Sequence, residues 1–317
     1  WKHEDASVMM FEHMMGDNEI KFNDEETCED DIIRMTSAVI DGRNIFSSEH
    51  DWLFDIVANK KNSIDVDKFD YIARDHHHTG RLDTYFDWER MMLSMEVIDG
   101  RICLEKNQGF AVQKLFNTRF QLFKEVYCHD VSMGVEFMIV DILKAANGVY
   151  EFHKQLQDPQ RYKYLGDSIL NEIERSQSPE LEKSRDLIRD LRRRRLYHLV
   201  GECLYPSEGL RDEDKVRQDF LNSCKTDTTI TKDDFVLCVL DLNYANGTTD
   251  PISKVDFYDK KEQKRHRFSQ NTNSISLLTP KVYSERVLRV FSKNREKTEA
   301  LKEKFKVFRE RFQKGRQ

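Results

Sequence analysis

Hydrophobic residues recur every three to four positions over the first two thirds of the chain, which is the spacing of amphipathic helices. After residue 206, apolar and β-branched residues instead gather in short runs that are typical of strands. The pattern therefore predicts a mainly α protein, with a helical core in residues 1-205 and a smaller α+β lobe in residues 206-317. The expected helices are residues 5–15, 31–39, 52–57, 65–76, 86–97, 112–129, 132–156, 165–174, 179–200, 280–291 and a final one bearing Leu301, Phe305, Phe308 and Phe312; the expected strands are 101–104, 235–243, 255–258 and 266–268.

The composition fits a mostly helical protein with enough large apolar side chains for a core. The 317 residues include only 5 Pro and 12 Gly but 20 Phe and 11 Tyr, and 34% are charged. The net charge of -6 does not single out a nucleic-acid binder, although Arg192–Arg195 and the tail from Lys293 are basic. The six cysteines form no Cys-x-x-Cys pair, which favours reduced thiols over a zinc knuckle or a disulfide framework. We expect no membrane span and no signal peptide.

The segment Ile64–His78 carries the most specific polar pattern. Four polar side chains share one face of the predicted helix: Asp67, Lys68, Tyr71 and Asp75. Such a row offers a carboxylate to a metal, an ammonium to a phosphate, and a phenol and a second carboxylate to hydroxyl groups. The alternative is an ordinary amphipathic helix, with a solvated charged face opposite a core stripe that contains Phe69 and Ile72. The pattern by itself leaves both interpretations open.

Arg119 lies in the middle of an apolar stripe on the predicted helix 112–129. The stripe consists of Leu115, Phe116, Phe120, Phe123, Val126 and Tyr127. A guanidinium in a buried face needs a compensating anion. That anion is either an internal carboxylate or a phosphate of a substrate.

The polar helix and its flanking segments resemble a known family. The matching segments run in order along nearly the whole chain: His3-Glu4, Ser7–His13, Ile56–Asn62, Ile64–Lys68, Asp70-Tyr71, Ala73–Asp75, His77-His78, Thr118-Arg119, Tyr127, His129, Val200–Glu202, Asp234-Phe235, Pro251-Ile252, Val255, Phe257-Tyr258 and Arg289–Lys293. They resemble the sterile-alpha-motif and HD-domain deoxynucleoside triphosphate triphosphohydrolases of animals. The resemblance implies part of a helical HD domain and hydrolysis of a dNTP to a deoxynucleoside and inorganic triphosphate.

The resemblance also implies roles for individual residues. It assigns five residues to the dNTP substrate: Lys68, Tyr71 and Arg119 to the triphosphate, Asp75 to the 3′-hydroxyl group, and Tyr127 to the deoxyribose, where it would exclude a 2′-hydroxyl. His3 resembles the catalytic histidine beside the α-phosphate. These residue types suit the roles, because Arg and Lys neutralise a polyanion.

Asp67 resembles the last carboxylate ligand of the family's metal site. The ion there would be a divalent metal (Zn, Fe, Mn or Mg), and the other ligands in the family are His…His-Asp, upstream of the position that matches His3. One carboxylate cannot hold a catalytic metal by itself. The chain begins at Trp1 rather than Met, so we expect it to be the C-terminal part of a longer protein, and to be inactive without the rest. His129-Asp130 is a second His-Asp pair, which we do not assign to the metal.

The family assembles into tetramers when GTP and dNTP activators bind, and this chain keeps only part of the expected activator set. Five residues resemble it: Arg90, His129, Val131, Arg194 and Lys293. Five others stand where the family has basic or longer polar groups: Glu105, Asn107, Glu125, Asp130 and His198. Replacing Arg by Glu at a phosphate site turns attraction into repulsion. The expectation is therefore a homodimer, with nucleotide-dependent assembly into a homotetramer left open beside ordinary surface variation.

Two other functions compete with a dNTP triphosphohydrolase. The basic tail Lys293–Arg316 and the Arg192–Arg195 run favour a non-catalytic homologue that binds nucleotides or single-stranded nucleic acid. The apolar face of the last helix, which includes Leu301 and Phe305, would instead suit a scaffold that docks on a partner. The family implies a location in the nucleus or cytoplasm, control of dNTP pools and a role in innate antiviral defence.

Overall fold

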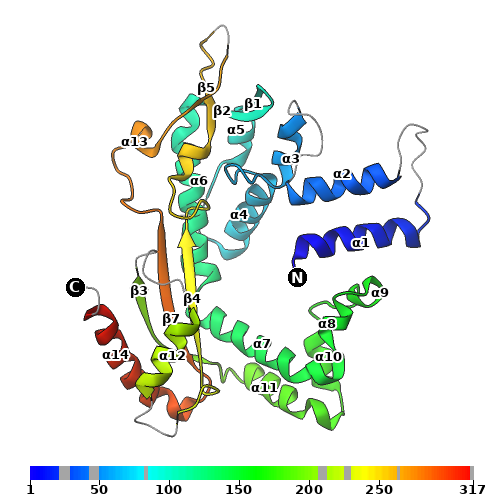
Figure 1. Ribbon diagram of the computed structural model, residues 1–317, viewed down its shortest axis with the longest axis vertical. Coiled ribbons are helices and arrows are strands. Elements are labelled where there is room, and N and C mark those ends of the chain that lie inside the picture. The colour runs from blue at the N-terminus through cyan, green and yellow to red at the C-terminus, as the bar shows by residue number, and fades with distance from the viewer. Residues whose placement is uncertain are drawn as a thin grey trace. The chain divides into compact units, whose positions relative to one another are not determined.

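A computed structural model describes residues 1–20, 29–42, 50–81, 85–205, 213–224, 230–262 and 265–314 (Figure 1). The fold is mainly helical and carries a small α+β region, as the sequence predicts. Its contacts divide the chain into two compact units, and each unit combines two separate stretches of sequence. The first unit comprises residues 1–122 and 243–283, and the second comprises residues 123–242 and 284–317. The domain boundary near residue 205 stays a prediction, since these units describe packing rather than function.

In its described residues, the first unit combines six α-helices of its N-terminal stretch with a small mixed sheet. In the sheet, β1 and β2 form an antiparallel hairpin through Asp99-Gly100, β2 pairs in parallel with β5, and β5 pairs with β6. Asp99 and Gly100 both have positive φ angles, of 49° and 69°, which is the geometry of a type I′ hairpin turn. The bounds are α1 His3–Asp17, α2 Glu29–Asp41, α3 Asp51–Val57, α4 Val66–Thr79, α5 Trp88–Met92, β1 Met95–Ile98, β2 Arg101–Glu105, α6 Gly109–Leu122, β5 Asp256–Tyr258, β6 Phe268–Ser269 and α13 Thr272–Ile275.

The second unit has helices around a three-stranded sheet of order β3-β7-β4. A single π-helical turn, Phe123–Tyr127, leads into its longest helix, α7. Among its described residues, buried side chains pack around Phe220 and Leu288 at the sheet, and others pack around Ile142 and Ile188. The bounds are α7 Asp130–Tyr150, α8 Phe152–Gln155, α9 Pro159–Tyr162, α10 Ile169–Arg175, α11 Glu182–Arg192, β3 His198–Tyr205, α12 Glu213–Cys224, β4 Phe235–Asn243, β7 Ser284–Ser292 and α14 Thr298–Lys314.

Several of the predicted helices are wrong in part or in whole. The helix predicted over 112–129 gives way to the π-helical turn Phe123–Tyr127, and the one predicted over 132–156 ends at Tyr150, because Glu151 is left-handed with a φ angle of 49°. Residues 86–97 form only the short helix α5, because the hairpin turn at 99–100 draws residues 95–98 into β1. The helix predicted over 179–200 ends at Arg192, and β3 begins at His198. Residues 284–292 form strand β7 rather than a helix, because they pair with β3 over the register His198–Ser292 to Tyr205–Arg286.

The last helix does not offer its apolar face to a partner. Leu301, Phe305 and Phe308 are buried in the core of the second unit against Phe220 and Val290. The interpretation of this face as a docking surface is therefore wrong for these three residues. The side chain of Phe312, which the sequence placed on the same face, lies outside the described residues.

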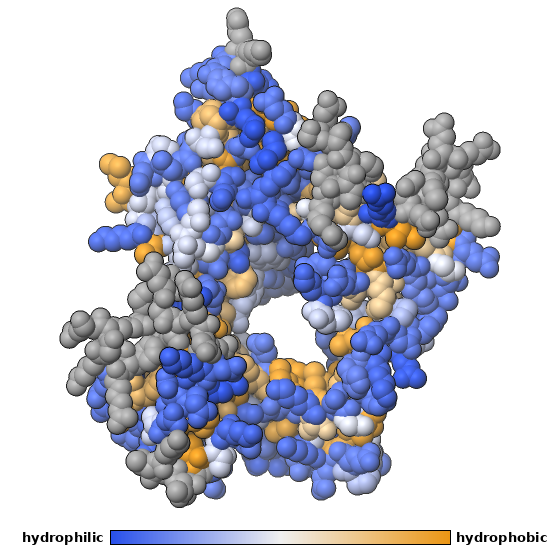
Figure 2. Space-filling model, viewed as in Figure 1, coloured by the Kyte–Doolittle hydropathy of each residue, from blue (hydrophilic) through white to orange (hydrophobic). Residues whose placement is uncertain are grey.

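Hydrophilic residues make up most of the surface that Figure 2 shows, in keeping with the charged fraction of 34%. Within the described ranges, no helix has both the length and the apolar content that a membrane crossing requires. The cysteines at 103, 128, 203 and 238 are free thiols.

Candidate functional site

Helix α4 forms as the sequence predicts. The Asp65 side chain caps its first turn by accepting a hydrogen bond from the backbone N–H of Lys68 at 3.2 Å. Gly80 ends the helix in the left-handed conformation, with a φ angle of 66°, and its N–H donates to the carbonyl of His76. Phe69 and Ile72 are buried, so the face that carries Asp67, Lys68, Tyr71 and Asp75 points away from the core stripe.

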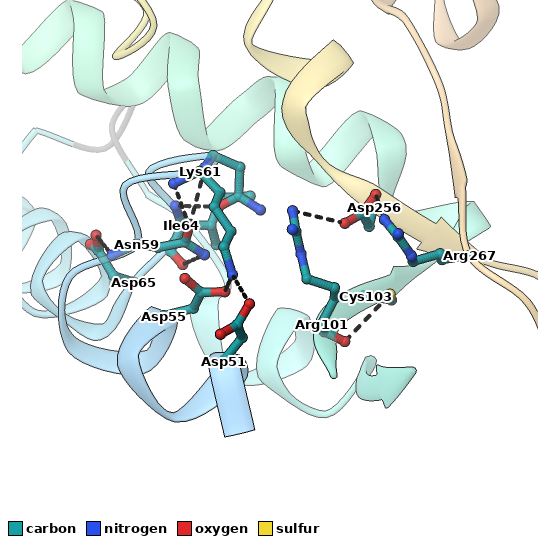
Figure 3. A network of polar contacts seen from close by, with 11 residues as sticks. Asp51, Asp55, Asn59, Lys61, Ile64, Asp65, Arg101, Cys103, Asp256 and Arg267 are labelled. Atoms are coloured by element: carbon teal, nitrogen blue, oxygen red, sulfur yellow. Dashed lines mark hydrogen bonds and ion pairs between the residues drawn. The ribbon is translucent and has the colours of Figure 1, made fainter. Parts of the chain in front are cut away.

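A compact loop of buried amides sets the start of α4 (Figure 3). Asn59 accepts hydrogen bonds from the backbone N–H groups of Lys61 and Asn62, and its side-chain amide donates to the carbonyl of Ile64. The backbone N–H of Asn59 donates to Oδ2 of Asp65 at 3.1 Å. Since Asn59 and Asp65 are both buried, each of these bonds satisfies a group that water cannot reach. The loop therefore fixes the residue at which α4 begins, and the polar residues of α4 follow from there.

Next to that loop, ion pairs hold the neighbouring elements in place (Figure 3). Lys61 lies 2.8 Å from the buried carboxylate of Asp55 on α3. In the sheet, Asp256 of β5 lies between Arg101 and Arg267, at 3.4 and 3.5 Å. Burial, and secondarily the Asp256 charge, raise the pKa of the Cys103 thiol to about 11, so this thiol stays protonated at neutral pH.

Tyr71 of α4 and Arg119 of α6 are brought together. Burial raises the pKa of Tyr71 to about 12, partly opposed by the charge of Arg119 and by the hydrogen bond that Arg119 donates to the phenol. The same guanidinium donates to the backbone carbonyl of Asn243 at 2.7 Å. Both of these acceptors are uncharged.

Lys68 and Asp75 flank Tyr71 on the same helix. The ammonium of Lys68 is mostly buried and lies 3.4 Å from Oδ1 of Asp65, so the capping carboxylate also holds this lysine. Asp75 is half-buried one turn beyond Tyr71. The first unit thus brings together four of the five predicted substrate residues on α4 and α6, whereas Tyr127 belongs to the second unit.

The two residues predicted for the chemical step lie at the surface of the first unit. Asp67 is exposed on α4, and the His3 side chain, at the start of α1, lies 3.3 Å from Glu4 and is 81% exposed. Among the described residues, no group of three or more His, Cys, Asp or Glu side chains could hold a metal ion. The described residues therefore do not by themselves fit the family's metal site. The roles of His3 and Asp67 stay predictions.

In the second unit, Tyr127 ends the π-helical turn, and its ring packs edge-on against Phe123 with centroids 5.0 Å apart. His129 follows as the N-cap of α7, since its Nδ1 accepts from the N–H of Val131 at 3.3 Å. Nδ1 of His129 also lies 3.1 Å from the carboxylate of Asp130. The imidazole therefore has a local structural role besides the predicted nucleotide contact.

Lys293 is engaged within its own unit. Its Nζ lies 2.5 Å from Oδ2 of Asp141 on α7, and the Tyr197 hydroxyl donates to the same oxygen at 2.9 Å. Burial, together with the Asp141 carboxylate, raises the pKa of Tyr197. Any anion that binds Lys293 would have to compete with Asp141 for this ammonium.

The other positions predicted to contact activators lie at or near the surface. Arg90 is exposed on α5, and Arg194 is exposed just after α11 with a φ angle of 59°. The departures from the family also lie outside the core: Glu105, Asn107, Glu125, Asp130 and His198. Glu105 accepts a hydrogen bond from the amide of Asn107 at 3.0 Å. The nucleotide contacts of these positions stay predictions.

Sequence reasoning missed the residues that hold the site, because it looked for groups that face a substrate. Asn59, Asp65 and Asp141 are examples, and each makes its hydrogen bonds or ion pairs within the protein. A usable signal existed in the first case. Asn59 and Asn62 precede an Asp at the start of a helix, which is typical of a side-chain-bonded loop followed by an N-cap.

Comparison with curated proteins finds relatives along nearly the whole chain. The deoxynucleoside triphosphate triphosphohydrolase SAMHD1 homolog of Dictyostelium discoideum is 35% identical over 305 residues, which are 96% of this chain and 57% of that protein. The deoxynucleoside triphosphate triphosphohydrolase SAMHD1 of Homo sapiens is 30% identical over 331 residues, or 92% of this chain and 52% of that protein. A putative HD domain-containing protein, L394 of Acanthamoeba polyphaga mimivirus, is 25% identical over 236 residues, or 69% of this chain and 50% of that protein.

The relatives confirm the resemblance to deoxynucleoside triphosphate triphosphohydrolases with HD-domain relatives, but not its sterile-alpha-motif part. Because they include an amoebal protein, the similarity is not confined to animals as the sequence suggested. No family model matches the chain. The chain spans about half the length of the curated relatives that it matches.

Proposed function

We propose that this chain, which belongs to the SAMHD1-like family of deoxynucleoside triphosphate triphosphohydrolases, is part of an enzyme that hydrolyses a dNTP to a deoxynucleoside and inorganic triphosphate. The observation that carries the proposal is the pairing of Tyr71 and Arg119 beside Lys68, in a chain related to these enzymes over more than 90% of its length. Two cations and a phenol on neighbouring helices suit a polyphosphate, since each can donate to phosphate oxygens.

Each predicted substrate residue would contact the part of the dNTP that suits its chemistry: the triphosphate, the 3′-hydroxyl or the deoxyribose. Lys68, Tyr71 and Arg119 would bind the triphosphate, and Tyr71 would do so as a neutral donor because its pKa is about 12. Asp75 would accept a hydrogen bond from the 3′-hydroxyl. Tyr127 would lie against the deoxyribose, where a 2′-hydroxyl would clash, and a dNTP would thereby be preferred to an rNTP.

A divalent metal would activate the attacking water and polarise the α-phosphate, as in metal-dependent hydrolases generally. Asp67 would supply one ligand and His3 would lie beside the α-phosphate. The described residues alone do not complete the ligand set of this metal. We expect this chain to be inactive by itself, with the activity belonging to the longer protein.

Regulation and assembly are further parts of the proposal. GTP or a dNTP would act as the activator, with Arg90, His129, Val131, Arg194 and Lys293 as contacts, and a homodimer would form a homotetramer when the activator binds. The Asp141–Lys293 ion pair would raise the activator concentration that is needed. Control of dNTP pools, antiviral defence and a location in the nucleus or cytoplasm rest on the family alone.

The test is release of inorganic triphosphate from dGTP by the full-length protein, with and without GTP. Asp67→Ala should abolish release, because the metal would lose a ligand. Asp70→Ala is a matched control that removes the same charge from the outer side of the same helix, where Asp70 pairs with Arg74, and it should leave release nearly unchanged. Absence of triphosphate from the folded wild-type protein, or equal loss in both variants, would contradict the proposal.

The alternative function, binding of single-stranded nucleic acid, has less support. Two arginines of the 192–195 run already form ion pairs, Arg192 with Glu174 at 3.1 Å and Arg195 with Asp190 at 3.3 Å. Salt-sensitive binding of a single-stranded oligonucleotide, in a folded protein without triphosphate release, would favour this alternative.

A further inference from the structure

The π-helical turn Phe123–Tyr127 is tied to strand β7 within the second unit. The N–H of Cys128 donates to the carbonyl of Phe123 at 2.9 Å, which is the wide ring of a π-turn. Such turns recur at functional sites, because they reorient the residues at their end. Here the turn ends at Tyr127, so whatever holds the turn also directs this side chain.

Arg289 of β7 reaches the end of that turn. Its guanidinium donates to the backbone carbonyl of Cys128, the residue between Tyr127 and His129. The same nitrogen lies 3.4 Å from Sδ of Met133 on α7. The Arg289 side chain is only 12% exposed, so its position is fixed by packing as well as by charge.

A cross-strand carboxylate orients this arginine. Glu202 of β3 stands opposite Arg289 in the register of the two strands, and its Oε2 accepts from Nε of Arg289 at 3.0 Å. Because Nε is held by Glu202, the terminal nitrogen is left to face the carbonyl of Cys128. A planar guanidinium can make both bonds at once, whereas a lysine ammonium cannot keep this geometry.

A second residue of β7 holds the beginning of the turn. Glu285 accepts from Nζ of Lys124 at 2.8 Å. Glu285 and Arg289 are four residues apart, so they project from the same face of the strand. Strand β7 therefore contacts the π-turn near both ends, through side chains of opposite charge.

We propose that β7 acts as a clamp on the π-turn, with Arg289 as a positioning residue for Tyr127. By holding the carbonyl of Cys128, Arg289 fixes the direction in which the Tyr127 side chain leaves the backbone. The functional part rests on the proposed function, since it takes Tyr127 to distinguish deoxyribose from ribose. Loosening the clamp should then lower sugar discrimination without removing any group that touches the substrate.

The clamp itself can be measured in this chain without activity. Arg289→Gln should speed hydrogen exchange of the backbone amides in residues 127–133 by about tenfold, because the turn loses a tether and opens locally more often. Arg286→Gln is the matched control, since Arg286 lies on the same strand but pairs with Asp241. Arg289→Lys should fall between wild type and Arg289→Gln. Equal exchange in the wild-type and Arg289→Gln proteins would overturn the clamp.

The positioning role is tested on the full-length protein by the ratio of kcat/KM for dATP to that for ATP. Arg289→Gln should lower the ratio about tenfold, because small misplacements of a positioning group cost rate steeply. Arg286→Gln should keep the wild-type ratio at a similar thermal midpoint. An unchanged ratio in Arg289→Gln, when Tyr127→Ala lowers it, would overturn the positioning role. If Tyr127→Ala also leaves the ratio unchanged while triphosphate is still released, the role of Tyr127 is wrong and the positioning role falls with it.

Discussion

The predicted site residues of the first unit and those of the second unit are held by contacts of different range. In the first unit, the loop before α4 is fixed by hydrogen bonds between residues two to six positions apart, such as those of Asn59 with Asn62 and Asp65. In the second unit, the segments around Tyr127 and α7 are fixed by residues more than 150 positions away, Glu285, Arg289 and Lys293. Local contacts form with little loss of chain entropy, whereas the distant ones need a completed sheet. The substrate helix should therefore resist perturbation of the sheet, and the Tyr127 turn should not.

The largest effect should come from the local network. Asn59→Ala would remove the acceptor for two backbone N–H groups and the donor to the Ile64 carbonyl, all in a buried loop. We expect α4 to lose about 2–4 kcal/mol of protection against opening, because buried groups would be left unpaired. Native-state hydrogen exchange of the α4 amides measures this loss separately from the second unit.

Asn18→Ala is the control for that experiment. Asn18 makes one side-chain hydrogen bond, to the Met14 carbonyl at 2.8 Å, and it is exposed. Its replacement should change α4 protection by less than about 0.5 kcal/mol. Equal effects of the two substitutions would mean that the buried loop does not hold α4.

A smaller, pH-dependent effect is expected at Asp141. Tyr197→Phe removes the hydroxyl that donates to Asp141 and should cost about 1–2 kcal/mol at neutral pH. The pKa of Tyr197 is raised in the folded protein, so this contribution is complete below the unfolded value near 10 and declines as pH rises above that value toward the folded pKa. Urea unfolding of the wild-type and Tyr197→Phe proteins between pH 7 and about 11 would measure the decline. A constant difference across that range would contradict the assignment.

The smallest effect should come from the outer side of α4. Asp70 and Arg74 form an exposed i,i+4 pair at 2.7 Å. Arg74→Gln should cost only about 0.3–0.5 kcal/mol, and high salt should remove most of that. Hydrogen exchange of the α4 amides at low and high ionic strength provides the measurement. A loss comparable to that of Asn59→Ala would mean that surface charge, rather than the buried loop, holds the helix.

The same difference in range explains what the sequence could predict about the fold. Helix α4 followed from a local signal, the periodicity of its polar and apolar residues, although its N-cap Asp65 was missed. Residues 280–291 were predicted as a helix that begins at Pro280, whereas residues 284–292 form strand β7. Only pairing with β3, more than 80 residues earlier, makes this segment a strand. Tertiary contacts override local propensity most where the partner is distant.

The candidate site was predictable to a similar extent. The row of four polar residues on α4 could be predicted directly from the sequence, and Arg119 was recognisable as a charged residue within an apolar stripe. Its neighbours could not be found, because Tyr71 and the Asn243 carbonyl come near only when α4, α6 and the chain around residue 243 fold together. The partner of Lys293 was missed for the same reason, since Asp141 lies 152 residues earlier.

The two units alternate along the sequence, and this order affects how the chain folds during its synthesis on the ribosome. The polypeptide passes between the units three times, at residues 122–123, 242–243 and 283–284. Neither unit can close early in synthesis, since the first waits for β5 and β6, and the second for β7 and α14. A polypeptide released after residue 205 would expose the unpaired edges of β2 and β3. Such exposed strand edges promote aggregation. Nascent chains should therefore depend on chaperones until the residues of α14 have emerged.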